Sequence, residues 1–343
     1  MSDPSATTAT ARPTRCLETG GPQSADSSSR GPAACLPPSQ FHLFTRFNIS
    51  HMTPADYARS FLRLNVLYGA PDGTTGTARG RARTYLNRSR NSRSTPSGYA
   101  DLVTAVQTAN QLQRGRTPPG RVWRIRNDPR HFHATRLRSG TASLKDIHNF
   151  LSYVVTYGIQ GATAESLGAW CDRHAIGVDC CGFASQYLAG VGAIPGFISS
   201  PRAHVERLRD RRTRVEDIRR GDTIVWYPYT SNWAHLRPRS HIAIVQERSG
   251  SNVSVAESVG GVGPRVTEPT PFEYLGAEAS DHAELSELVQ GEGRFGPFFR
   301  FTEGGGRDGR RLRPCVVIPT GDQLGRHYPE EDWVDERDET QED

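Results

Sequence analysis

The chain has 343 residues, of which 35% are hydrophobic and 23% charged, and its formal net charge is +5. This length suffices for a catalytic domain and a second module, while the lean apolar content indicates disordered parts. The six cysteines lack zinc-ligand spacing and form no regular disulfide framework, and no apolar run reaches the length of a membrane span. We therefore expect no metal, no cofactor and no membrane span. No ordinary secretory signal is visible, which predicts a cytoplasmic protein or export by a non-standard route.

Residues 1–40 are rich in Ser, Thr, Ala, Pro and Gly, a composition typical of a disordered arm. Residues 41–140 form an arginine-rich region that we expect to be small, basic and mostly helical. In this region Thr53 caps a short predicted helix that Pro54 opens, and a second helix is predicted at Tyr99–Leu112.

Arginine is dense at residues 79–93 and 114–138, and Trp123 and Phe132 lie in the second of these stretches. Basic residues with interleaved aromatics are typical of nucleic-acid surfaces, and they also suit an anionic polymer such as that of a cell wall. An ordinary solvated face has the same composition, so the pattern leaves all three interpretations open.

Residues 141–320 change from helical to strand periodicity. Ser143 starts a capping box with Asp146, and a further helix is predicted at Ala164–His174. The strands predicted after them are Thr223–Tyr227, His241–Gln246, Val253–Ser258, Phe298–Thr302 and Cys315–Ile318. Helices followed by an antiparallel sheet indicate the α+β class. Residues 260–313 are Gly-rich and are interpreted as an insertion near the site, and 321–343 as an acidic, solvated tail.

One stretch between the helices and the strands combines a turn with a reactive residue type. It reads Asp179-Cys180-Cys181-Gly182-Phe183 and runs into an amphipathic helix with Ala184, Tyr187, Leu188 and Val191 on one face. Asp179 is a good N-cap, and a cysteine in the first turn of a helix is a favourable place for a thiolate. Counted at the helical repeat, Cys180 lies over the buried face and Cys181 is turned about 100° away. Gly182 would let a substrate backbone come close.

This stretch resembles the Asp-Cys-Ser-Gly signature of the NlpC-type cysteine peptidases, with Cys181 in place of the usual serine. Two later segments add to the likeness, one from Asp217 to Trp226 that contains Gly221-Asp222, and one reading Ser240-His241-Ile242-Ala243-Ile244-Val245. The resemblance covers about residues 145–275. It implies a papain-like fold, with Cys180 as nucleophile and His241 as base. His235 is a competing base, but its surroundings are typical of a loop.

The third member of the site depends on how two strands pair. A three-residue loop at Arg248–Gly250 places Glu257 opposite His241, whereas a two-residue loop at Ser249-Gly250 places Ser258 there. Glu257 shares a face with valines and needs a partner, which favours it as the residue that orients the imidazole. The family usually has His, Asn or Gln at this position, so Glu257 departs from its pattern.

Three functional hypotheses follow from these residues. The resemblance implies a cysteine amidohydrolase that cleaves peptidoglycan stem-peptide amides, with Cys180, His241 and Glu257 as its triad. The same triad would also serve a deamidase, a transglutaminase-like enzyme or another acyl-transfer effector that acts on protein amides. In the third hypothesis, a non-catalytic protein binds an anionic polymer through its arginine-rich region.

Overall fold

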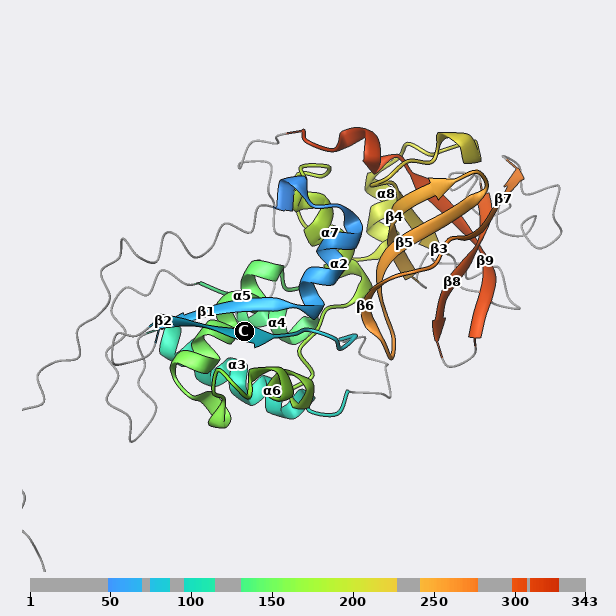
Figure 1. The fold of residues 1–343 in the computed structure, drawn as a ribbon. Coiled ribbons are helices and arrows are strands. Elements are labelled where there is room, and N and C mark those ends of the chain that lie inside the picture. Colours follow the sequence, from blue (N-terminus) through green and yellow to red (C-terminus); the bar gives the residue numbers. More distant parts are fainter. Residues whose placement is uncertain are drawn as a thin grey trace, which may run out of the picture.

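The computed structural model describes residues 49–69, 75–86, 96–114, 131–226, 241–276, 298–306 and 309–326. The α+β class is confirmed, because helices lie beside a seven-stranded antiparallel sheet (Figure 1). The arm at 1–40 and most of the acidic tail fall outside the described residues, as do long parts of both arginine-dense stretches.

The predicted helices are present, and local signals explain where they start. Thr53 caps α2 (Pro54–Leu62), and the Ser143–Asp146 capping box opens α5 (Leu144–Thr156). Three more predicted helices are α3 (Tyr99–Gln113), α6 (Leu167–Arg173) and α7 (Cys180–Gly190). Helix α6 begins three residues later than predicted, after a turn in which Thr163 and Ser166 hydrogen-bond each other.

Several elements were not predicted. They include the hairpin of β1 (Leu64–Gly69) and β2 (Thr75–Gly80), so the region before residue 140 is less purely helical than expected. Two short helices, α4 (Ala134–Ser139) and α8 (Pro201–Arg207), were also missed. Helix α8 carries the same kind of start signal that identified α2, a hydroxyl cap followed by proline, since Ser200 caps it and Pro201 opens it. The described residues also form four short 3-10 helices: η1 (Ile49–His51), η2 (Ile159–Gly161), η3 (Val215–Asp217) and η6 (Thr320–Gln323).

The large sheet has the order β4-β3-β9-β8-β7-β5-β6, and an additional β4–β5 pairing closes it on itself. Its strands are β3 (Thr223–Trp226), β4 (His241–Ser249), β5 (Asn252–Val259), β6 (Gly263–Val266), β7 (Thr270–Gly276), β8 (Phe298–Gly306) and β9 (Gly309–Ile318). Within 260–313, the stretch interpreted as an insertion, the described residues contribute β6, β7, β8 and part of β9 to this sheet. That stretch therefore includes structural strands of the sheet.

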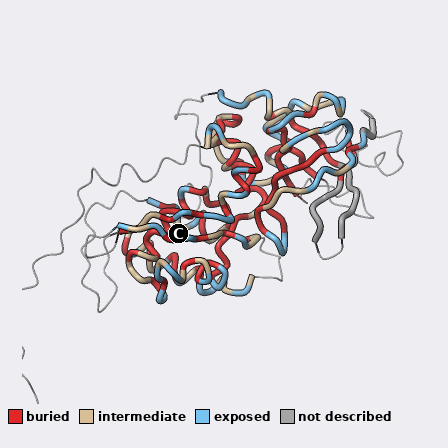
Figure 2. The backbone as a smooth tube through the Cα atoms, viewed as in Figure 1, coloured by how far each residue is buried: buried red, intermediate tan, exposed pale blue. Residues whose placement is uncertain are grey.

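The two faces of the sheet bury different side chains. One face holds a cluster built around Trp226, Val245, Val255, Phe272 and Phe301. The other face joins Ile242, Ile244 and Ala256 to a larger cluster shared with the helices. Buried residues occur in the helices as well as in the strands of the sheet (Figure 2).

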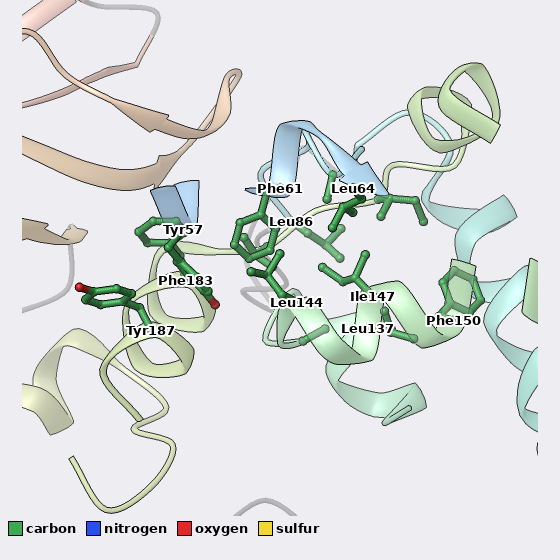
Figure 3. Close-up of a cluster of buried hydrophobic side chains, with 14 of the residues drawn as sticks. Tyr57, Phe61, Leu64, Leu86, Leu137, Leu144, Ile147, Phe150, Phe183 and Tyr187 are labelled. Carbon is green, nitrogen blue, oxygen red and sulfur yellow. The ribbon is translucent and has the colours of Figure 1, made fainter. Parts of the chain in front are cut away.

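The larger cluster crosses the expected boundary near residue 140. Tyr57 of α2 lies against Phe183 and Tyr187 of α7, with ring centroids 5.2 and 5.3 Å apart, and Phe61 lies 5.9 Å from Phe183 (Figure 3). All four side chains are buried, and each contributes about 1.5–3 kcal/mol through the hydrophobic effect. Helix α2 therefore helps to hold the cysteine-bearing helix in place.

Both predicted registers of the β4–β5 hairpin are wrong. The observed pairs include Ile244↔Ala256 and Ser249↔Asn252, so the two-residue loop is Gly250-Ser251, and the register shifts between Val245 and Glu247. The extra residue is Gln246, whose side-chain Oε1 accepts a hydrogen bond of 2.8 Å from the Ala55 amide of α2. The bulge thus re-aims one side chain to fasten α2 to the sheet.

Asp222, from the predicted Gly-Asp segment, is fully buried and joins three parts of the chain. Its carboxylate accepts two hydrogen bonds from Arg212, at 2.9 and 3.0 Å, and one from each of the Arg219 and Gly321 amides. Arg212 also donates to Asp322, at 2.8 Å. The cluster fixes the start of β3 against the turn that follows β9.

We expect Asp222→Ala to lower the free energy of unfolding by about 3–5 kcal/mol, because it breaks a buried ion pair and leaves two backbone amides without their acceptor. Urea unfolding followed by circular dichroism measures this. The matched control is Glu216→Ala, which removes the exposed Arg214–Glu216 pair and should cost less than about 1 kcal/mol. Equal losses in the two variants would contradict the structural role of Asp222.

Candidate active site

Cys180 is the first residue of α7, and the turn before it is fixed from two sides. The Asp179 carboxylate accepts a hydrogen bond from the Gly182 amide, as an N-cap does, and the Asp179 amide donates to the Gly140 carbonyl at 2.7 Å. A Cβ on Gly182 would lie 2.3 Å from the Gly140 oxygen. The close approach that we expected of a substrate at Gly182 is thus made by the protein's own backbone.

Helix α7 is buried on nearly every side, whereas the sequence predicted an amphipathic helix. The predicted stripe is buried, but Cys181, Phe183 and Ser185 are buried as well. The reason is that α7 lies between the sheet and α2, so it has a neighbour on more than one side. Both cysteines are buried, so burial does not show which of them is the nucleophile. The side chains that contact each thiol are what distinguish them.

The Cys180 thiol is surrounded by hydrogen-bonding side chains. The Tyr85 hydroxyl donates to Sγ at 3.5 Å, and Cys181 and His241 also hydrogen-bond to it. The Cys181 hydrogen bond, then the hydrogen bond and charge of His241 and the bond from Tyr85, outweigh burial and hold the pKa of Cys180 well below its ordinary value. The site therefore favours the thiolate, the nucleophilic form of cysteine.

His241 is the first residue of β4 and connects the thiol to a carboxylate. Its Nε2 donates to Glu257 Oε2 at 2.6 Å, which leaves Nδ1 for Cys180. The imidazole also lies beside the Trp226 indole, with ring centroids 5.4 Å apart. Burial acts to lower the pKa of His241, but the hydrogen bonds with Cys180 and Glu257 raise it to about 10. The ring is therefore held as an imidazolium between two anions.

Glu257 reaches His241 although neither predicted register is present. Continuing the observed β4–β5 pairs would set Glu257 opposite Ala243, on the face that His241 also shares. The contact with His241 is thus diagonal, which is within reach of two long side chains. Glu257 is fully buried, and burial acts to raise its pKa, but His241 and Arg265 lower the pKa below its ordinary value.

The remaining predicted residues have other positions. The Ser258 hydroxyl donates to the Val178 carbonyl at 2.7 Å, so it ties β5 to the segment before α7. Ser240 and His235 lie outside the described residues. Of the two candidates for the third position, only Glu257 is hydrogen-bonded to His241 in the part of the chain that the structure describes.

The sequence interpretation missed two residues at this site, Tyr85 and Arg265. Tyr85 lies in a segment that runs alongside the turn before α7, where Thr84 bridges to Gly177. Nothing in its local sequence marks it. Arg265 stands directly opposite Glu257 in the β5–β6 pairing, and this pairing was not predicted because the stretch was interpreted as an insertion.

These groups form an alternating chain of charges, from Cys180 through His241 and Glu257 to Arg265. A preformed thiolate beside an imidazolium is an activated nucleophile with its proton donor already in place. Such an arrangement suits attack on a carbonyl carbon. Among the described residues, no group of three His, Cys, Asp or Glu side chains is arranged to hold a metal ion.

Comparison with protein-family models, with curated proteins and with solved structures finds no match to this chain. In the ranges that the structure covers, no helix is both long enough and apolar enough to cross a membrane.

Proposed function

We propose that the protein is a cysteine-dependent amidohydrolase in which Cys180 attacks, His241 moves the proton and Glu257 orients the imidazole. The observation that carries this proposal is the 2.6 Å hydrogen bond between His241 and Glu257, beside a Cys180 thiol whose pKa is lowered by Cys181, His241 and Tyr85. Shifted pKa values at a nucleophile and its base are what a catalytic site requires.

Acylation begins when the Cys180 thiolate attacks the carbonyl carbon of an amide. The negative charge passes to the carbonyl oxygen, which lies near the positive N-terminal end of α7, where the Cys180 backbone amide is the first donor of the helix. The Tyr85 hydroxyl, 3.5 Å from the sulfur, is a second donor beside it. The C–N bond then breaks as the His241 imidazolium gives its proton to the leaving nitrogen, and a thioester remains on Cys180.

Deacylation reverses these roles. The imidazole, now neutral, takes a proton from water while the water oxygen attacks the thioester carbonyl. Breaking the C–S bond restores the thiolate and imidazolium and releases a carboxylic acid. An amine in place of water would give acyl transfer instead, so the triad alone does not decide between the two reactions.

The substrate class that we propose is the peptidoglycan stem peptide, with the finer papain-like, NlpC-type assignment. The support is the order of three segments along the chain: Cys180 opens α7, Asp222 directly precedes β3, and His241 opens β4, which pairs with β3. The capping role of Asp179 and the buried ion cluster of Asp222 give two of these segments a structural reason for their residues.

Incubation of the full chain with bacterial sacculi tests this proposal. We expect release of muropeptides with new free amine and carboxyl ends, detected by mass spectrometry, and no release by the Cys180→Ala variant. Walls of several chemical types should be compared, because the bond cleaved depends on cross-link chemistry. No release from any of them would overturn the peptidoglycan proposal.

Two further measurements separate the other functions. Ammonia release from a glutamine-containing protein, or incorporation of a small amine, would indicate a deamidase or transglutaminase-like enzyme. A chloroacetamide probe at neutral pH should label Cys180 if either enzymatic function holds, because both need the thiolate. An unlabelled Cys180, together with salt-sensitive binding to an anionic polymer, would favour the non-catalytic binding protein.

A further inference from the structure

The Glu257 carboxylate has a second partner besides His241. Oε2 accepts from the imidazole at 2.6 Å, while Oε1 accepts from Arg265 twice, from Nε at 2.8 Å and from Nη2 at 2.6 Å. The two residues are a directly opposed cross-strand pair of β5 and β6. Glu257 is fully buried, whereas the Arg265 side chain is 27% exposed. The guanidinium therefore separates the buried carboxylate from solvent.

We propose that Arg265 is a positioning residue that holds Glu257 ionised and aimed at His241, and so maintains the thiolate at Cys180. This inference rests on the proposed function, because it assigns Arg265 a part in that same site. In the part of the chain that the structure describes, the side chain of Arg265 hydrogen-bonds to Glu257 and not to the sulfur or the imidazole, so it acts through Glu257.

The first reason is geometric. Two donors from one rigid guanidinium fix Oε1, so that Oε2 alone faces the imidazole. Lysine has the same charge but cannot reproduce that fork. Loss of the fork would let the carboxylate turn about its terminal bond, which would weaken the bond to His241.

The second reason is electrostatic. Burial favours the protonated form of Glu257, and the positive charges of His241 and Arg265 oppose this. Without Arg265 the pKa of Glu257 rises. Once protonated, Glu257 no longer stabilises the imidazolium, and the thiolate loses its counter-ion at a higher pH than in the native protein.

Other charged or titratable groups lie near the ion chain. Around Cys180 they are Tyr85, Asp179, Cys181 and His204. Helix α2 packs on β5 and β6, and its charged side chains Asp56 and Arg59 are 53% and 68% exposed. Among the described residues, Arg265 has the only guanidinium within hydrogen-bonding distance of the Glu257 carboxylate.

The test measures the rate at which iodoacetamide alkylates Cys180 in the full chain between pH 4 and pH 9, with peptide-resolved mass spectrometry. Native protein, Arg265→Met and Arg265→Lys are compared. The matched control is Arg248→Met, since Arg248 lies on β4 and binds only backbone carbonyls of Ile218 and Gly250 among its identified partners. Circular dichroism establishes that each variant is folded.

We expect the acid midpoint of alkylation to rise by at least about one pH unit in Arg265→Met, with a loss of about fivefold or more in rate at the native midpoint. Arg265→Lys should fall between Arg265→Met and the native protein, and Arg248→Met should match the native profile. An unchanged profile in folded Arg265→Met would overturn the inference.

A rescue experiment covers the case in which Arg265→Met does not fold. In Arg265→Ala, tens of millimolar guanidinium should restore part of the alkylation rate near neutral pH, while sodium at the same ionic strength should not. No rescue in a folded variant counts against the inference. Hydrolysis of sacculi is measured separately, so a shifted alkylation profile without hydrolysis would contradict the proposed function alone.

Discussion

Cys180→Ala is expected to lower turnover by more than about 10⁴-fold, because it removes the nucleophile and leaves only binding and carbonyl polarisation. The fold should persist, since alanine fits the first position of α7 and Asp179 still caps the helix. Initial rates on whichever amide substrate proves active, with circular dichroism as a check, measure the effect. Substantial turnover in a folded Cys180→Ala variant would refute the assignment of the nucleophile.

Cys181→Ser is the matched control for this substitution, and it should remain active within about tenfold. The Cys181 side chain hydrogen-bonds to Cys180, and a serine hydroxyl is a stronger donor than a thiol. Cys181→Ala removes that donor, so it should raise the pKa of Cys180 and move alkylation to higher pH. If Cys181→Ser were inactive and Cys180→Ala active, both the helix phasing and the roles of the two cysteines would be wrong.

Glu257→Gln is expected to reduce kcat by about 10²–10⁴-fold with little change in KM. The amide has nearly the shape of the carboxylate but no charge, so the imidazolium loses one of its two counter-ions. Cys180 and Glu257 together raise the pKa of His241 to about 10, so loss of the Glu257 charge lowers that pKa, and the alkaline limb of the pH–rate profile should move to lower pH. An unchanged kcat would contradict the orienting role.

Ser258→Ala is the matched control on the same strand. Its hydroxyl binds the Val178 carbonyl, and no identified interaction joins it to the imidazole. Turnover should therefore stay within a few-fold of the native value. A severe loss in Ser258→Ala, with Glu257→Gln unaffected, would mean that the third residue had been assigned to the wrong strand position.

Local sequence signals were sufficient for the parts of the site that depend on neighbouring residues. Asp179 caps α7 as its residue type predicts, and Cys180 and His241 stand at the first positions of the helix and strand that periodicity indicated. The partnership of Glu257 with His241 was also expected, since a buried carboxylate needs a partner. The predicted register of β4 and β5, from which that contact was inferred, was wrong.

That mistake has a local part and a long-range part. The turn is Gly250-Ser251, whereas both predicted loops end at Gly250, so the pairs next to the turn already differ. The register then shifts again at the bulge of Gln246, whose side chain bonds to Ala55, 191 residues earlier in the chain, and hairpin rules contain no information on that contact. Tyr85 and Arg265 were missed for the same reason, because each comes to the site from an element whose packing was not predicted.

The shared core of α2 and α7 bears on how such a site could pass between proteins. Tyr57 and Phe61 cover Phe183 and Tyr187, and Tyr85 from the same early region reaches the sulfur. A recombination point near residue 140 would separate the nucleophile from side chains that bury its helix and polarise its thiol. A transferable segment that carries this site would therefore have to begin at or before α2, so that α2, Tyr85 and α7 stay together.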